Sequence, residues 1–74
     1  MFLKEAKDTR NEGVVIQYNA DRGFGFLLSN GNKYFFHINE VRKYEQNKVQ
    51  NNSKLEFTPA NNNKGQIAIN IKVL

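Results

Sequence analysis

The sequence of 74 residues contains no cysteine and no tryptophan, and it has one histidine and one proline. Without cysteine there is no disulfide and no thiolate metal site to reinforce a core, a composition that suits a reducing compartment. No apolar run approaches the roughly 20 residues of a membrane span, and the first residues lack the basic region and apolar stretch of a signal peptide. We therefore expect a cytoplasmic chain without a membrane partner.

Acidic residues are also few, seven against eleven lysines and arginines, which gives a net charge of +4. The charges within residues 1–12 cancel, so the whole positive excess lies in residues 13–74. Such an excess favours a polyanionic partner without identifying one. The length allows one domain, close to the smallest size that a single apolar core can hold together.

Residues 1–12 are predicted to be an N-terminal extension of a single domain formed by residues 13–74. Phe2, Leu3 and Ala6 could make one apolar side of a short helix, but a helix of that length is marginal in water. One interpretation is a flexible or loosely packed terminus. The other is that the apolar residues of the extension cover an exposed edge or a second copy of the chain, as in a homodimer.

After the extension, β-branched and aromatic runs are separated by turn residues, which is typical of short strands. Asn30-Gly31 is a strong signal for a tight β-hairpin. Pro59 is expected to end a strand because proline cannot donate a ladder hydrogen bond. Residues 39–53 are mostly polar and are predicted to be a long loop with one short helical turn near its start. The predicted strands are residues 14–18, 24–28, 33–38, 54–58 and 67–73.

Five short strands without a persistent helix indicate an all-β fold. An open sheet of this size would leave its edges unpaired, so a closed five-stranded antiparallel barrel is predicted. In the last strand Ile67, Ile69, Ile71 and Val73 alternate with small or polar residues, which predicts one apolar face.

Four flat rings are predicted to share one face of the central hairpin, because successive side chains of a strand point to opposite faces. Gly23 and Gly25 would leave room beside the rings, and Arg22 would add positive charge. An extended anionic chain with flat groups of its own fits this surface, which describes a single-stranded nucleic acid; each stacked base contributes about 1–3 kcal/mol. The four rings are those of Phe24, Phe26, Phe35 and His37.

The alternative is that these rings belong to the core, as aromatic residues of a small domain usually do. The alternation argues against it, because the same two strands offer a second apolar set to the opposite face. A domain of this size cannot bury both faces. The second set is Leu27, Tyr34, Phe36 and Ile38.

His37 is the only histidine, and with no cysteine to share a metal no zinc site is predicted. A general base would need an orienting carboxylate and a substrate pocket, and the sequence indicates neither. We interpret His37 as a residue that stacks on or hydrogen-bonds a base, with a structural histidine as the alternative. No nucleophile constellation or nucleotide-hydrolysing loop is present, so neither enzyme activity nor a cofactor is predicted.

From residue 13 to about residue 73 the sequence resembles the cold-shock domain, the five-stranded oligonucleotide-binding barrel (OB-fold) of bacterial cold-shock proteins. The run from Tyr18 to Leu27 is similar to the first ribonucleoprotein-type motif of that family, and Phe35-Phe36-His37 is similar to the second. Phe57 and Gly65 fall at matching spacings. The RNA-recognition motif contains a similar run, but it has the two motifs in the opposite order and requires two helices.

The resemblance implies that single-stranded RNA and DNA bind over the first three strands. The four rings would stack on bases, Tyr18 would lie beside them, and the turn before them would hydrogen-bond bases and phosphate. Arg22 and Lys33 would hold the phosphate backbone. The implied nucleic-acid-binding residues are Tyr18, Asn19, Asp21, Arg22, Phe24, Phe26, Lys33, Phe35, His37 and Tyr44.

Five positions depart from the family pattern and predict weaker or differently selective binding, because stacking partners and lysines are lost. They are Val14 and Ile16 in place of lysines, Gln17 in place of a tryptophan, Ile38 in place of a phenylalanine, and Gln46 in place of a loop aromatic that Tyr44 partly replaces.

The leading hypothesis is a low-specificity binder of single-stranded RNA or DNA that acts as an RNA chaperone or a regulator of transcription or translation. The alternative is a protein-interaction or oligomerisation module on the same barrel. In that case the aliphatic residues Val14, Ile16 and Ile38, together with Phe2-Leu3, face another protein.

Overall fold

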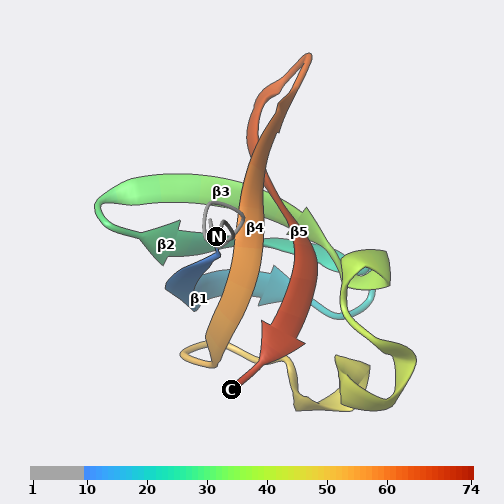
Figure 1. Ribbon diagram of the computed structural model, residues 1–74. Helices are drawn as coiled ribbons and strands as arrows, with labels where there is room; N and C mark the ends of the chain where they lie inside the picture. Colours follow the sequence, from blue (N-terminus) through green and yellow to red (C-terminus); the bar gives the residue numbers. More distant parts are fainter. Residues whose placement is uncertain (1–9) are drawn as a thin grey trace, which may run out of the picture.

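Five β-strands and two short 3-10 helices make up residues 10–74, the part of the chain that the computed structural model describes (Figure 1). Phe2 and Leu3, which in one interpretation cover a strand edge or a second copy of the chain, lie outside these residues. The first strand begins at Asn11, two residues before the expected start of the domain. The elements are β1 (Asn11–Asn19), β2 (Phe24–Ser29), β3 (Asn32–His37), η2 (Ile38–Glu40), η3 (Lys43–Lys48), β4 (Lys54–Asn62) and β5 (Gly65–Val73).

The strands close into a barrel in the order β1-β2-β3-β5-β4, which confirms the predicted five-stranded barrel. Four of its neighbouring pairs are antiparallel. The fifth differs from the expectation, because β3 and β5 are parallel and meet at Phe35 and Ile67. The chain crosses the end of the barrel after β3, so β4 runs opposite to β3 and β5 returns parallel to it.

The β2–β3 hairpin has the predicted turn at Asn30-Gly31. Ser29 pairs with Asn32, and the two loop residues have φ angles of 51° and 82°. Two consecutive positive φ angles define a type I′ turn, whose twist matches that of the flanking strands, and asparagine followed by glycine adopts them readily. The turn thereby fixes the register of the two aromatic strands.

The β4–β5 hairpin is longer than predicted and projects beyond the barrel (Figure 1). The expectation that Pro59 ends the fourth strand is wrong, since β4 continues to Asn62 and Pro59 pairs with Ala68. Pro59 lies beyond Asn11–Phe57, the last β1–β4 pair within the described residues. Where a strand has no partner on one side, a proline whose nitrogen faces that side costs no ladder hydrogen bond.

A β-bulge breaks the alternation expected for the last strand. Opposite Phe57, β5 contributes two residues, Asn70 and Ile71, and Asn70 has a φ of 50°. The extra residue moves the inward-facing positions, because a bulge shifts the side-chain alternation by one. Ala68 and Ile71 are therefore buried, whereas Ile67 is half-buried on the outer side. The single apolar face predicted from alternate residues is wrong for this strand.

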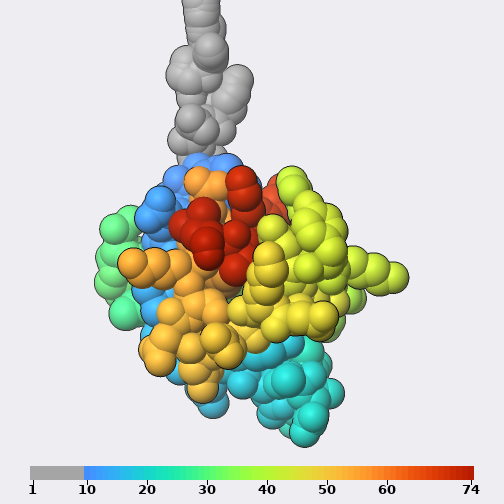
Figure 2. Space-filling model, turned by 90° about the horizontal axis from the view of Figure 1, so that it is seen from below, coloured from blue at the N-terminus to red at the C-terminus, as the bar shows by residue number. Residues whose placement is uncertain are grey.

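The segment between β3 and β4 forms two 3-10 helices instead of the one helical turn predicted. Val41 is buried, and Nε2 of Gln46 donates hydrogen bonds to the carbonyl oxygens of Ile38 and Val41. Oε1 of Glu45 accepts a hydrogen bond of 3.2 Å from the backbone N–H of Val73. Figure 2 shows this segment, in yellow-green, packed beside the C-terminal end of β5, in red. It covers one end of the barrel.

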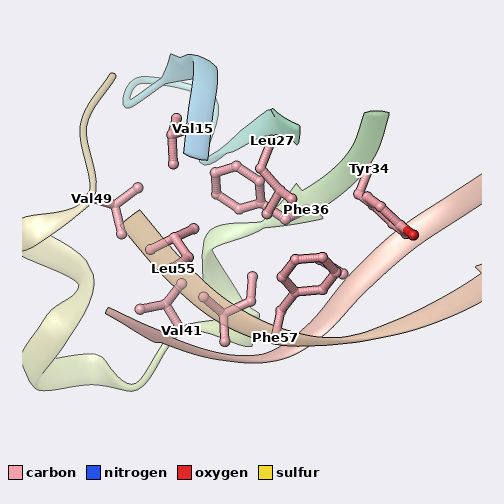
Figure 3. Close-up of a cluster of buried hydrophobic side chains, with 10 residues drawn as sticks. Val15, Leu27, Tyr34, Phe36, Val41, Val49, Leu55 and Phe57 are labelled. Atoms are coloured by element: carbon pink, nitrogen blue, oxygen red, sulfur yellow. The ribbon is translucent and has the colours of Figure 1, made fainter. Parts of the chain in front are cut away.

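The core confirms that β2 and β3 have an inner and an outer apolar set. Leu27, Tyr34 and Phe36 are buried, and Ile38 packs against them partly buried. None of the four rings predicted to face outward belongs to this cluster. The buried apolar residues are Val15, Leu27, Tyr34, Phe36, Val41, Val49, Leu55, Phe57, Ala68 and Ile71 (Figure 3).

Gly25 has a role other than the predicted one of leaving room beside the rings. It is buried, and a Cβ atom built on it would lie 2.9 Å from Cα of Tyr18 and closer still to the carbonyl oxygen of Gln17. The absence of a side chain therefore allows the backbones of β1 and β2 to approach each other.

Gly25→Ala is expected to destabilise the fold by about 1–3 kcal/mol, because the added methyl group overpacks against the β1 backbone. Urea unfolding followed by circular dichroism measures this loss. Gly31→Asn is the control, since a Cβ there meets nothing within 4 Å and asparagine tolerates the positive φ. Equal midpoints for Gly25→Ala and the wild type would contradict the close approach.

Candidate nucleic-acid interface

A cluster of phenylalanine rings covers the outer face of β2 and β3. The ladder places Phe24 opposite His37 and Phe26 opposite Phe35. The ring centroids of Phe24 and Phe35 are 5.7 Å apart at 37°, and those of Phe26 and Phe35 are 5.7 Å apart at 70°. The three phenylalanines are half-buried and His37 is exposed. We call these four residues the ring platform, and it contains all four rings predicted to share a face.

Two predicted cations lie against the platform. Cζ of Arg22 is 5.5 Å from the ring centroid of Phe24, and Nζ of Lys33 is 4.5 Å from that of Phe26. These distances are typical of cation–π contacts, which contribute about 0.5–1 kcal/mol at exposed sites. The platform therefore combines flat apolar rings with a positive charge beside Phe24 and another beside Phe26.

His37 combines an exposed ring with a structural hydrogen bond. Its Nδ1 accepts a hydrogen bond of 3.1 Å from the backbone N–H of Asn39 at the start of η2. In the neutral imidazole the hydrogen must therefore lie on Nε2, because the two ring nitrogens divide the donor and acceptor roles. The exposed ring consequently offers one donor and two faces to a ligand, and the two interpretations of His37 are compatible.

The turn between β1 and β2 holds the predicted polar residues at one end of the platform. Oδ1 of Asn19 accepts a hydrogen bond of 3.2 Å from the backbone N–H of Arg22, and its carbonyl oxygen accepts one of 2.8 Å from Gly23. These bonds are local, as asparagine typically makes in turns. Asp21 and Arg22 are exposed, so their side chains are accessible.

The two predicted tyrosines contact residues outside the platform. The ring of Tyr18 stacks on the core residue Phe36, with centroids 5.9 Å apart at 16°. Tyr44 is 70% exposed, and its hydroxyl oxygen accepts a hydrogen bond of 3.1 Å from Arg42. This bond and the charge interaction with Tyr44 raise the pKa of Arg42. Among residues 10–74 neither tyrosine ring pairs with a ring of the platform.

Two of the five positions that depart from the family pattern, Val14 and Ile16, form an aliphatic area beside the platform together with Leu28. Val14 pairs with Leu28 across β1 and β2, and they are 37% and 43% exposed. Ile16 is 45% exposed, and Gln17 lies opposite Phe26 after a bulge in β1. The outer face is therefore aromatic over β2 and β3 and aliphatic toward β1.

A groove beside the platform was not foreseen from the sequence. It has a volume of about 590 Å³, and its apolar lining consists of Phe26, Phe35 and Ile67. Residues 62–66 at the tip of the β4–β5 hairpin complete it. The asparagine-rich run gave only a turn signal, and no local pattern indicates that this turn lies beside β3.

Metal and membrane sites are not found in the described part of the chain. No group of three or more histidine, cysteine, aspartate or glutamate residues could hold a metal ion within residues 10–74. Over the same residues, no helix has the length and apolar character needed to cross a membrane.

The closed barrel with rings on β2 and β3 defines the class of protein. Small five-stranded barrels of this kind are OB-folds, a class whose members bind oligonucleotides or oligosaccharides over strands 2 and 3. A solved structure of drosophila Unr CSD456 has the same fold, with a TM-score of 0.71 and 29% identity over 93% of this chain. The match covers 28% of that chain, so it concerns one part of a longer protein.

Sequence comparisons identify the family. The sequence model of the protein family 'Cold-shock' DNA-binding domain matches residues 11–74. The chain is 34% identical over 64 residues to the cold shock-like protein CspG of Escherichia coli K12, covering 84% of this chain and 91% of that protein. It is 31% identical over 64 residues to the cold shock-like protein CspA of Bordetella pertussis, covering 84% and 96%. The chain therefore belongs to the cold-shock domain family, a family of nucleic-acid-binding proteins.

Proposed function

We propose that this protein binds single-stranded RNA or DNA with low sequence specificity on the ring platform. The observation that carries the proposal is the position of three phenylalanine rings on the outer face while Leu27, Tyr34 and Phe36 fill the core. Rings kept in contact with water are available to stack on unpaired bases, at about 1–3 kcal/mol per base.

The cations give this surface its affinity for the phosphate backbone. A base that stacks on Phe26 takes the place of the Lys33 ammonium, which then pairs with a neighbouring phosphate. Arg22 does the same beside Phe24. Because each neutralised phosphate releases counterions, binding depends on salt. Stacking tolerates any base because every base has a π-face, which accounts for the low specificity of the platform.

The proposed biological role is that of an RNA chaperone or a regulator of transcription or translation in the cytoplasm. A base can stack on the platform only when one of its faces is uncovered, and in a paired duplex both faces are covered by neighbouring base pairs, so the platform binds an open strand. Binding only the open form shifts an RNA toward that form by mass action, without ATP.

A second candidate function is a protein-interaction or oligomerisation module. The aliphatic area formed by Val14, Ile16 and Leu28 favours it, because adjacent exposed aliphatic side chains are typical of contact surfaces. Ile38 contributes little to that surface, since it packs against the core.

A salt titration tests the binding proposal. We expect the affinity for a labelled single strand of about seven nucleotides to fall as salt rises from about 50 to 200 mM, measured by fluorescence anisotropy. Arg22→Gln combined with Lys33→Gln should reduce the slope of log affinity against log salt by about 1.4, because each lost phosphate contact removes about 0.7.

Lys48→Gln combined with Lys72→Gln is the matched control, since it removes the same charge from exposed positions away from the platform. Its slope should equal that of the wild type. Absence of binding, together with a molecular size that grows with protein concentration, would support the second candidate function instead.

A further inference from the structure

The groove between β3 and the β4–β5 hairpin has an apolar part and a polar part. Phe26, Phe35 and Ile67 form the apolar part, and residues 62–66 form the polar part. Its volume of about 590 Å³ lies within the range of about 300–1,000 Å³ that is usual for ligand pockets. The polar part comes from the hairpin that projects beyond the barrel (Figure 1).

Three side-chain amides line this groove, those of Asn62, Asn63 and Gln66. Oδ1 of Asn62 accepts a hydrogen bond of 2.9 Å from the backbone N–H of Lys64, which holds the turn. Asn63 and Gln66 are exposed, and within residues 10–74 their side chains make no hydrogen bond. Each of these amides offers a donor beside an acceptor, and the edges of unpaired bases offer the complementary groups.

We propose that the groove holds one unpaired base of the bound strand and recognises its edge through the amides of Asn63 and Gln66. The inference rests on the proposed function, because the groove shares two rings with the platform. Stacking binds a base whatever its identity, whereas hydrogen bonds to the edge distinguish one base from another. The groove thus adds a base preference at one position to an otherwise unselective surface.

Continuity and charge argue for a nucleotide as the occupant. Phe26 and Phe35 belong both to the platform and to the groove, so a strand stacked on the rings passes directly into it. Lys64 lines the groove, and Nζ of Lys33 is 4.5 Å from the centroid of Phe26. No carboxylate is among the described residues that line the groove, so nothing there repels a phosphate.

Affinities for three homopolymers test the inference. We expect strands of about seven adenosines, cytidines or uridines to differ in affinity by about 5- to 150-fold between the best and the worst, the range for one bidentate contact. Asn63→Ala combined with Gln66→Ala should keep the affinity for the weakest strand and lose most of the preference. Fluorescence anisotropy at constant salt measures both.

Asn47→Ala combined with Gln50→Ala removes two exposed amides from the segment before β4 and is the matched control. It should keep the full preference. Binding of all three strands with equal affinity, or an Asn63/Gln66 variant that keeps the preference, would overturn the inference and leave the proposed function intact. Failure of the wild type to bind any strand would overturn the proposed function, and the inference with it.

Discussion

Phe35→Ala is expected to weaken binding of single-stranded oligonucleotides by about 5- to 150-fold, which corresponds to the 1–3 kcal/mol of one stacked base. Phe35 is the central ring, 5.7 Å from the rings of Phe24 and Phe26. Its removal takes away one stacking surface and also the neighbour that orients the other two rings. Anisotropy titrations of wild type and variant at the same salt concentration measure the loss.

The stability of Phe35→Ala serves as its internal control. The side chain is half-buried, so its removal should cost less than the about 3–5 kcal/mol usual for a core phenylalanine, and the circular dichroism spectrum should be unchanged. Binding that survives in a folded Phe35→Ala protein would contradict the role of the platform.

Phe36→Ala is expected to destabilise the domain by about 3–5 kcal/mol, because it leaves a cavity in the core. The side chain is 1% exposed, and its ring also supports Tyr18 at a centroid distance of 5.9 Å. A domain of this length has a stability of only about 4–11 kcal/mol, so the variant should be close to unfolding at room temperature. Thermal and urea unfolding measure this effect.

Phe36→Leu is the matched variant, since it keeps more of the apolar volume and should lose less stability. If Phe36→Ala were as stable as Phe35→Ala, the two adjacent residues would not face opposite sides of the sheet. Phe35→Ala and Phe36→Ala together therefore distinguish a binding-surface residue from a core residue at adjacent positions.

The central hairpin was predictable because its signals are local. The Asn30-Gly31 turn sets the register of β2 and β3, and alternation along each strand then decides which ring faces the core. Phe36 is buried and Phe35 lies outside for that reason. The contact of Lys33 with Phe26 follows from the same register, whereas Arg22 reaches Phe24 from the turn two residues before it.

Elsewhere the local signals were insufficient. A proline is compatible both with the end of a strand and with an unpaired strand edge, so Pro59 alone does not distinguish the two. Within the described residues β1 does not pair with β4 beside Pro59, and β4 can therefore continue past it. The bulge at Asn70 likewise changes which side chains of β5 face inward. Gly25 owes its position to the approach of a second strand, which is not apparent from its neighbours in sequence.

Local signals in the sequence were enough to predict the barrel class, the central hairpin and the separation of its inner and outer rings, because alternation and turn chemistry act between residues close along the chain. The parallel pairing of β5 with β3, which brings Asn63 and Gln66 into a groove with Phe26 and Phe35, has no local signal and arises from the fold as a whole. Contacts between residues some thirty positions apart arise from closure of the barrel, which depends on all five strands at once.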